Sequence, residues 1–269
     1  LCEHRVENVP EGVTVLVTEN NRIALALLSD HFYGHPSAEM NVIGVTGTNG
    51  KTTVCNLILD ALKMEGVEPV NNRMGSNINT GIATSLIQSS GIAGRCRKSL
   101  GVFEIDERSA LRVFPYLIPD HMVITNLSRD SIMRNGHPEY ISGILTKYIP
   151  EKTKLIMNAD DLICCSVAPS NERVYFGIEK MDTDLDHCEN LIQDFQICPK
   201  CHHKLEYEYV RYSHIGRAFC PECGFKAPEY DYAGCNVDLE DMTIEVREKD
   251  GSAAYRLLND SVFNIYNVV

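Results

Sequence analysis

The sequence contains no tryptophan, and aromatic residues make up only 7% of its 269 positions. It has no apolar run near the roughly 20 residues that a membrane-spanning helix needs, so no transmembrane segment is expected. Basic residues are also scarce, because 25 Lys and Arg stand against 37 Asp and Glu and leave a formal net charge of -12. This charge argues against a protein that binds nucleic acid by general electrostatic attraction.

The rest of the composition is that of a globular protein, with 44% hydrophobic and 23% charged residues. At this length a single core begins to divide, so we expect one large domain with an added module. Seven of the eleven cysteines are scattered: Cys2, Cys55, Cys96, Cys164, Cys165, Cys188 and Cys235. The other four form two C-x-x-C pairs, which are typical of a metal site in a reducing compartment rather than a disulfide framework. We therefore predict a cytoplasmic protein.

Strand-like and helix-like segments alternate along most of the chain. Short apolar runs lie at residues 42–45, 100–105, 122–126, 155–158 and 174–176, and helical segments at 23–32, 52–64, 81–92, 109–116 and 138–148. This alternation predicts an α/β fold with a mostly parallel sheet and helices on both faces. Beyond the cysteine pairs, residues 242–258 predict a small antiparallel hairpin with its turn at 249–251.

One strand-to-helix junction carries a glycine-rich loop. Residues 42–53 read Val-Ile-Gly-Val-Thr-Gly-Thr-Asn-Gly-Lys-Thr-Thr. Gly47 and Gly50 allow backbone N–H groups to face phosphate oxygens, and the helix N-terminus adds partial positive charge. Lys51 can reach the β- and γ-phosphates, and the Thr52 hydroxyl can ligate Mg²⁺. A strict Walker A motif has Gly where Val45 stands, so we predict a variant P-loop, with a plain turn as the alternative.

Several motifs together resemble those of the Mur ligase family, which builds the peptide stems of the bacterial cell wall. The motifs are residues 46–52, 72–77 with Gly81, 104–107, 125–130 and 158–161. Members of this family use ATP to convert a carboxylate into an acyl phosphate, which an amine then attacks. The resemblance implies a P-loop NTPase-type central ATPase domain over residues 41–269. Residues 1–40 are similar to the end of the preceding domain, or a linker, in the tripeptide-synthesising branch.

The chain starts without an initiator Met, and residues 264–267 resemble the start of the central domain's final helix. We therefore expect the family's C-terminal ligase domain to be missing from this piece, which alone would be inactive.

The same resemblance implies roles for individual residues. Nucleotide contacts fall on Gly47, Thr48, Asn49, Gly50, Lys51, Thr52, Thr53, Asn77 and Asn126. Asn77 would contact the adenine base, and Asn126 and Asp130 would line the site. The magnesium ligands are Thr52 and Glu104, and the catalytic residues are Lys51, Glu104, Asp106 and Glu107. Independently, a carboxylate at a strand end beside the loop suits Mg²⁺, although an acidic solvated turn is the alternative.

The sequence departs from the family pattern at a second metal site. Ordinary amino-acid-adding members follow the Asn-x-x-x-Asp segment with a metal-binding His, whereas Ser131 stands here. They also place a carbamylated Lys on the next helix, but residues 141–145 contain no Lys and Lys147 is displaced. This departure argues against the second Mg²⁺ site and against the standard tripeptide branch.

Two cysteine pairs predict a zinc ribbon over residues 195–230. Cys198, Cys201, Cys220 and Cys223 form C-x-x-C, eighteen residues, C-x-x-C. Four thiolates at this spacing can close a tetrahedron around Zn²⁺, and a closed site is structural. Unrelated buried thiols are the alternative, and a redox pair is disfavoured because neither motif follows a strand and opens a helix. We expect His202, His203 and His214 at the surface or beside the ligands.

A ribbon inserted late in such a domain resembles the branch of the family that amidates the D-glutamate of lipid II together with a glutaminase. This resemblance implies ATP, Mg²⁺ and structural Zn²⁺ as cofactors, and lipid II or another muramyl peptide as substrate. A class I glutamine amidotransferase subunit is the implied partner, bound through the missing C-terminal domain. The alternatives are a tripeptide-type amino-acid ligase acting on a UDP-muramyl peptide, and a nucleotide-binding module without turnover. Acidic residues around the ribbon disfavour a nucleic-acid-binding protein.

Overall fold

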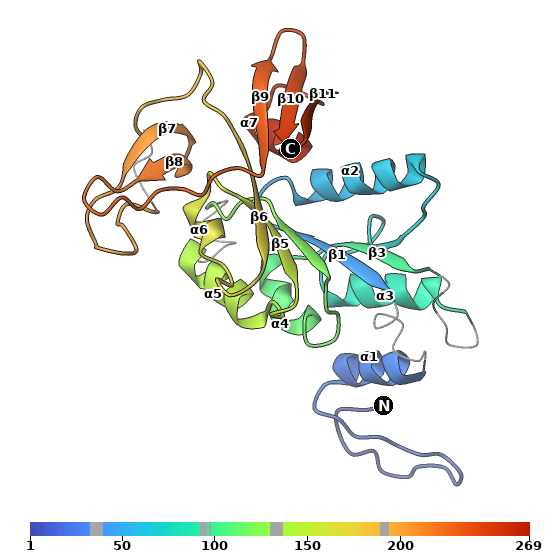
Figure 1. The fold of residues 1–269 in the computed structure, drawn as a ribbon. Coiled ribbons are helices and arrows are strands. Elements are labelled where there is room, and N and C mark those ends of the chain that lie inside the picture. The colour runs from blue at the N-terminus through green and yellow to red at the C-terminus, as the bar shows by residue number, and fades with distance from the viewer. Residues whose placement is uncertain (33–39, 92–95, 97, 130–136, 189–193) are drawn as a thin grey trace.

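The computed structural model of the chain describes residues 1–32, 40–91, 96, 98–129, 137–188 and 194–269. Its centre is a nine-stranded sheet with the order β11-β10-β9-β6-β5-β4-β1-β3-β2 (Figure 1). The strands are β1 Asn41–Thr46, β2 Val70–Asn71, β3 Leu100–Glu104, β4 His121–Ile124, β5 Lys154–Asn158, β6 Arg173–Ile178, β9 Tyr232–Asp238, β10 Thr243–Glu248 and β11 Gly251–Arg256. All neighbouring pairs from β2 to β9 are parallel, which confirms the α/β prediction.

The central strand β1 is apolar because both of its faces are covered. In register, Val45 pairs with Glu104 of β3, and Thr46 pairs with Ile124 of β4. Since the three strands are parallel, their carboxyl ends meet at one edge of the sheet. The glycine loop and Glu104 therefore come together although more than fifty residues separate them in the sequence.

Helices cover both faces of the sheet, as predicted. They are α2 Lys51–Met64, α3 Asn79–Ser89, α4 Ala110–Val113, α5 Pro138–Tyr148, α6 Leu162–Cys165 and α7 Val262–Val268, with a 3₁₀ turn at Glu107–Ser109. On one face, Cys55 and Leu59 of α2 pack against Val45 and Val102. On the other face α3 to α6 enclose a larger core that includes Phe103. The short helix α7 lies beside α2 (Figure 1).

The predicted hairpin forms β10 and β11, but it does not stand as a separate element. Strand β9 joins it to the main sheet, pairing in parallel with β6 and antiparallel with β10. Strand β9 and the two-residue β2 were not predicted from the sequence. The sequence of β9, Tyr-Ala-Gly-Cys-Asn-Val-Asp, has Gly, Asn and Asp, which are depleted in strands. Its strand conformation therefore depends on its two neighbours.

A two-stranded antiparallel sheet forms a separate projection (Figure 1). It consists of β7 Glu206–Tyr212 and β8 Ile215–Phe219, and both lie inside the predicted ribbon. The cysteine pairs flank the open end of this hairpin, whose strands end at Glu206 and Phe219. The turn between Tyr212 and Ile215 forms the opposite end, which we call the ribbon tip.

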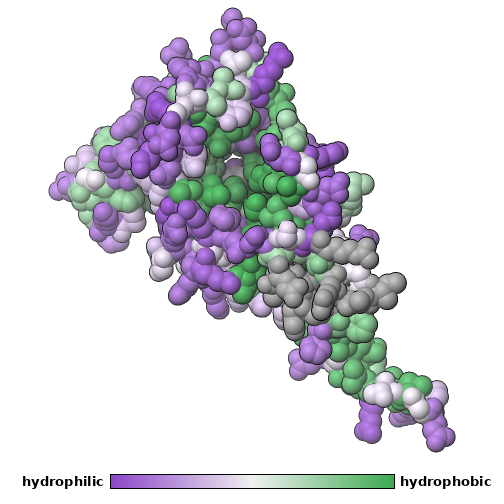
Figure 2. Space-filling model, turned by 45° about the vertical axis from the view of Figure 1, so that its right-hand side comes forward, coloured by the Kyte–Doolittle hydropathy of each residue, from purple (hydrophilic) through white to green (hydrophobic). Residues whose placement is uncertain are grey.

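The N-terminal segment contains α1 Asn21–Phe32, as the helical pattern predicted. Its Leu25 and Phe32 side chains are exposed, and hydrophobic residues show on the surface of this projecting segment in Figure 2. The sequence Gly34-His35-Pro36 predicts a stop signal for this helix, but these residues lie outside the described part of the chain. Within the described part of the chain, no helix has both the length and the apolar character needed to cross a membrane.

Candidate nucleotide site and metal cluster

The glycine loop turns sharply between β1 and α2. Gly47 has φ 130° and Gly50 has φ 84°, a region that side chains with a Cβ rarely adopt. A Cβ at Gly47 would overlap the Thr125 hydroxyl and crowd the Asn126 carbonyl. Gly50 precedes the first residue of α2, and no side chain caps that helix. The loop therefore leaves the α2 N-terminus available to an anion.

Thr125 and Asn126, which follow β4, make hydrogen bonds to the glycine loop. The backbone N–H of Thr48 donates to the Asn126 carbonyl at 2.8 Å, and Asn49 N–H donates to the Asn126 side-chain oxygen at 3.2 Å. The Asn126 amide in turn donates to the Asn49 carbonyl at 3.0 Å, as does the Thr125 hydroxyl at 2.6 Å. Asn126 is 4% exposed. Because its amide is already engaged with the backbone of the loop, we assign Asn126 a positioning role behind the loop.

Lys51 reaches back over the loop that precedes it. Its ammonium donates to the Gly47 carbonyl at 3.0 Å and lies 3.6 Å from a carboxylate oxygen of Glu107. That Glu107 oxygen is buried and has no hydrogen-bond partner among the described residues. Burial raises the pKa of Glu107, and the charge of Lys51 opposes the rise. The Lys51 ammonium therefore lies beside the loop, where it can contact a phosphate bound there.

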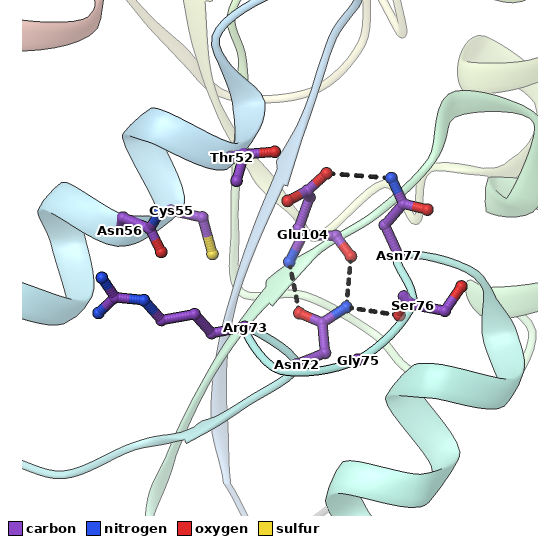
Figure 3. A pocket seen from close by; sticks show the side chains of 9 residues that line it. All are labelled: Thr52, Cys55, Asn56, Asn72, Arg73, Gly75, Ser76, Asn77 and Glu104. Atoms are coloured by element: carbon purple, nitrogen blue, oxygen red, sulfur yellow. Dashed lines mark hydrogen bonds between the residues drawn. The ribbon is translucent and has the colours of Figure 1, made fainter.

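Glu104 ends β3 at a pocket of about 280 Å³ beside the start of α2 (Figure 3). The pocket is lined by Thr52, Cys55, Asn56, Asn72, Arg73, Gly75, Ser76, Asn77 and Glu104. Asn77 donates from its side-chain amide to Glu104 at 3.0 Å, and Asn72 bonds both the N–H and the carbonyl of Glu104. The Thr52 hydroxyl and the Glu104 carboxylate both border the pocket. These hard oxygen donors fit the magnesium site expected from the sequence.

Asn77 was expected to contact the adenine base, and its position in the structure can be compared with that role. If Glu104 holds Mg²⁺ for the nucleotide, Asn77 would lie near the phosphate end of the nucleotide, because it donates to Glu104. The contact between Asn77 and adenine stays a prediction, and the geometry favours a role beside Glu104. The buried thiol of Cys55 also lines this pocket, where burial and the charge of Glu104 raise its pKa to about 12. It is therefore a neutral thiol rather than a nucleophile.

Asp106 belongs to the acidic motif but serves a helix start. One of its carboxylate oxygens accepts from the N–H and the hydroxyl of Ser109, which caps the 3₁₀ turn. The structure thus separates the predicted acidic residues: Glu104 borders the pocket, Glu107 pairs with Lys51, and Asp106 caps a turn. Thr53 lies on the first turn of α2 and is half-buried.

The four predicted metal-binding cysteines gather in one cluster. Their sulfur atoms all lie within 4.8 Å of one another. Cys198 and Cys223 sulfurs are 3.6 Å apart, and those of Cys201 and Cys220 are 3.5 Å apart. Sulfurs around tetrahedral Zn²⁺ at 2.3 Å are separated by about 3.8 Å, so the cluster fits that ion. His202 and His203 are exposed, as expected.

His214 differs from that expectation. It is 4% exposed, and its imidazole pairs with Asp161 at 3.0 Å. Asp161 also accepts the N–H of Leu127 and caps α6 through Ile163. Burial raises the Asp161 pKa, but the positive charge and hydrogen bond of His214 outweigh it and lower the pKa below its ordinary value. This pair fastens the ribbon tip to the main sheet.

Two residues gained roles that their motifs did not disclose. Asn72 clamps the backbone of Glu104, and the side chain of Asn267 on α7 lies directly over Gly50. In the sequence both residues stand out only as parts of motifs, and neither role is visible until β3 and α7 are placed. Asp130 and Ser131 lie outside the described residues, while Lys147 is exposed on α5.

Comparisons with known proteins found a matching family model and similar proteins. The Mur ligase middle domain is the family that matches, over residues 45–216. The subunit MurT of lipid II isoglutaminyl synthase (glutamine-hydrolyzing) from Staphylococcus aureus is 30% identical over 231 residues, 85% of this chain and 51% of that protein. MurT of Streptococcus pneumoniae is 30% identical over 233 residues, again 85% of this chain and 51% of that protein.

A solved structure of a pseudomurein peptide ligase type C from Methanothermus fervidus is similar in fold, with a TM-score of 0.66 and 26% identity. The similarity covers 92% of this chain and 50% of that one. The chain thus spans about half the length of the relatives that it matches.

Proposed function

The chain belongs to the Mur ligase family, and on that premise we propose that it activates a carboxylate of a peptidoglycan precursor for amidation. In this proposal ATP binds at the glycine loop, the acceptor is the D-glutamate of lipid II, and the nucleophile is ammonia from a glutaminase. One observation carries the proposal: the glycine loop, Lys51 and Glu104 meet at the carboxyl edge of the sheet. Likeness to the two MurT subunits, whose names specify lipid II and glutamine hydrolysis, supports the choice of acceptor and amine.

The loop residues would bind and orient the nucleotide. Backbone N–H groups at the start of α2 hold phosphate oxygens, and Lys51 moves its charge from Glu107 to the β- and γ-phosphates. Thr52 and Glu104 would hold Mg²⁺, which supplies positive charge to the phosphates during transfer. Asn77 and Asn72 fix the Glu104 side chain and backbone, so this carboxylate needs little reorganisation when the ligand enters.

The reaction has two steps in this scheme. An oxygen of the substrate carboxylate attacks the γ-phosphorus, the bond to the bridging oxygen breaks, and ADP leaves. Ammonia then attacks the acyl carbon, loses a proton, and expels phosphate to leave the amide. The protein's part is to align these groups and to neutralise charge, because phosphoryl transfer depends mainly on positioning and electrostatic stabilisation.

A product assay tests the proposal. The full protein and a class I glutaminase are incubated with lipid II, ATP and nitrogen-labelled glutamine, and the lipid product is analysed by mass spectrometry. We expect labelled amide at D-glutamate, and its loss in Lys51→Ala but not in Lys63→Ala, an exposed lysine on the same helix. Transfer of an amino acid instead of ammonia would replace the proposal with a tripeptide-type ligase. Nucleotide binding without any product would favour a non-catalytic binding module.

A further inference from the structure

The ribbon tip is fastened to the main sheet by a buried arginine. Arg211 of β7 is 2% exposed at its side chain and makes two hydrogen bonds to the Asp184 carboxylate, at 2.7 and 2.8 Å. It also donates to the Glu179 carbonyl at 2.9 Å and to the Tyr266 hydroxyl at 2.8 Å. A buried guanidinium is costly unless such partners satisfy it. Arg211 therefore fixes three segments relative to one another: the ribbon tip, the stretch after β6, and α7.

Asp160 follows β5 and also links α7 to the ribbon, together with Tyr230. Its carboxylate accepts the Tyr266 hydroxyl at 2.7 Å and the Tyr230 hydroxyl at 2.5 Å, and its carbonyl accepts the N–H of Gly216 in β8. Asp160 is 0% exposed, and Arg211 lies 3.7 Å from it. Tyr266 thus sits between a buried acid and a buried base. Its hydroxyl is one of the points that hold α7, which also packs through Ile265 and Phe263.

Helix α7 continues from this point to the phosphate loop. The residue after Tyr266 is Asn267, whose side-chain oxygen occupies the place that a Cβ at Gly50 would take. Gly50 directly precedes Lys51 and the first turn of α2. A displacement of α7 therefore changes the packing of the loop at the position where phosphate would bind.

We propose that the ribbon is a positioning element for the nucleotide site. Arg211 and Tyr266 hold α7 so that Asn267 packs on Gly50, and loss of the metal from the four-cysteine cluster loosens this contact and weakens nucleotide binding. Arg211 and Tyr266 act through Asn267 and are positioning residues. The proposal rests on the nucleotide site proposed above.

A metal in the cysteine cluster can affect α7 because it would close the open end of the β7–β8 hairpin, whose other end contacts α7 through Arg211. The cysteine pairs flank Glu206 and Phe219, and Arg211 lies five residues along β7, roughly 17 Å away at the rise of an extended strand. A two-stranded hairpin alone is marginally stable in water. The cysteine cluster holds one end of the hairpin and Arg211 holds the other. Loosening the first end therefore increases the motion of the second.

Two buried tyrosines provide a matched test. Tyr266 makes hydrogen bonds to Asp160 and Arg211, whereas the Tyr212 hydroxyl is buried with no hydrogen-bond partner among the described residues. Their rings contact edge to face, with centroids 6.3 Å apart. Tyr266→Phe removes the link and keeps the ring, and Tyr212→Phe removes a hydroxyl that links nothing. Metal-free wild-type protein, dialysed into excess Mg²⁺, is the third sample.

Two readouts are compared well below each protein's melting temperature. One is the affinity for a non-hydrolysable Mg·ATP analogue by isothermal titration, and the other is hydrogen exchange of residues 262–268 without nucleotide. We expect Tyr266→Phe and metal removal each to weaken binding about two- to thirtyfold and to accelerate exchange in α7. Tyr212→Phe should match the wild type in both.

The outcomes distinguish the positioning role of the ribbon from the proposed nucleotide site. Wild-type affinity and exchange in Tyr266→Phe, or after metal removal, overturn the positioning role and leave the nucleotide site standing. Equal weakening by Tyr212→Phe also overturns it, because the effect would then come from packing in general. Failure of the wild type to bind the analogue overturns the nucleotide site, and the coupling with it. Should Tyr266→Phe not fold, the metal-free wild type still decides between these results.

Discussion

Glu107 is a buried carboxylate whose charge depends on where Lys51 points. Burial raises its pKa above the ordinary value of 4.5, and Lys51 at 3.6 Å restrains the rise. In the proposed complex the phosphates draw Lys51 away and add negative charge nearby. Both changes favour the protonated form, so the pKa of Glu107 is higher in the complex than in the free protein.

Nucleotide binding should therefore be accompanied by proton uptake. Because the complex binds more protons than the free protein, affinity for a Mg·ATP analogue rises as pH falls through the Glu107 pKa of the complex and levels off below that of the free protein. Titration calorimetry in buffers of different ionisation enthalpy measures the uptake directly. The part due to this residue should vanish in Glu107→Gln, and the same uptake in that variant would assign the proton to another group.

The sequence predicted the residues of the site whose roles depend on local geometry. Gly47, Gly50 and Lys51 could be recognised because strand, loop and helix are contiguous, and Glu104 because strand ends of a parallel sheet share an edge. The roles of Asn72 and Asn267 depend on partners 32 and 217 residues away, at Glu104 and Gly50. No local pattern encodes such contacts.

Among the elements, the loop between β1 and α2 depends on the backbone conformation of Gly47. Gly47→Ala places a Cβ in the positive-φ region and against Thr125, so we expect a loss of about 1–3 kcal/mol in the free energy of unfolding, and more if the clash is not relieved. Gly143→Ala is the control, because its Cβ would meet nothing within 4 Å in α5 and should gain about 0.5–1 kcal/mol. Urea denaturation measures both, and equal stability of the two variants would contradict the loop geometry.

The four-cysteine cluster should hold one Zn²⁺ per chain. Structural zinc contributes about 10–16 kcal/mol of apparent binding free energy in isolated zinc-finger peptides, part of which is folding free energy. Elemental analysis should find zinc in the wild type and in Cys2→Ser, and a loss of most of it in Cys198→Ser and Cys220→Ser. Full zinc content in a cluster variant would place the ion elsewhere, and none in the wild type would refute the site.

Elements with strong periodicity could be predicted, and those that depend on neighbours could not. The apolar residues of β1 and the helical pattern of α2 identified both segments within one residue. The hairpin at 249–251 was predicted from its turn, but its attachment through β9 was not, because β9 pairs with β6 from more than fifty residues away. Strand β2 is two residues long and gives no periodic signal.

At the scale of the whole molecule, Asp161 connects the ribbon tip, α6 and the loop after β4. Its pKa lies below the ordinary 3.8, since His214 and its hydrogen bonds outweigh the burial that would raise it. A lowered carboxyl pKa contributes stability that is present above the unfolded value of 3.8 and is lost as pH falls through the folded value.

Asp161→Asn should therefore lower stability at neutral pH by about 3 kcal/mol, because it leaves a buried partner unpaired. The variant should also lose less stability than the wild type as pH falls from 5 through the folded pKa of Asp161, because this group no longer titrates. Thermal melts over that pH range measure both effects. The exposed Asp241→Asn should behave as the wild type, and an unchanged acid limb in Asp161→Asn would show that this pair does not govern acid unfolding.

The phosphate-loop assignment is tested most directly by binding of a non-hydrolysable Mg·ATP analogue to the wild type, Lys51→Ala and Lys63→Ala, measured by isothermal titration. Lys51 contacts the Gly47 carbonyl and contributes little to the core, whereas Lys63 is exposed in the last turn of the same helix. We expect all three proteins to melt at similar temperatures, and Lys51→Ala alone to lose detectable binding. Wild-type affinity in Lys51→Ala would contradict the phosphate-loop assignment and the function built on it.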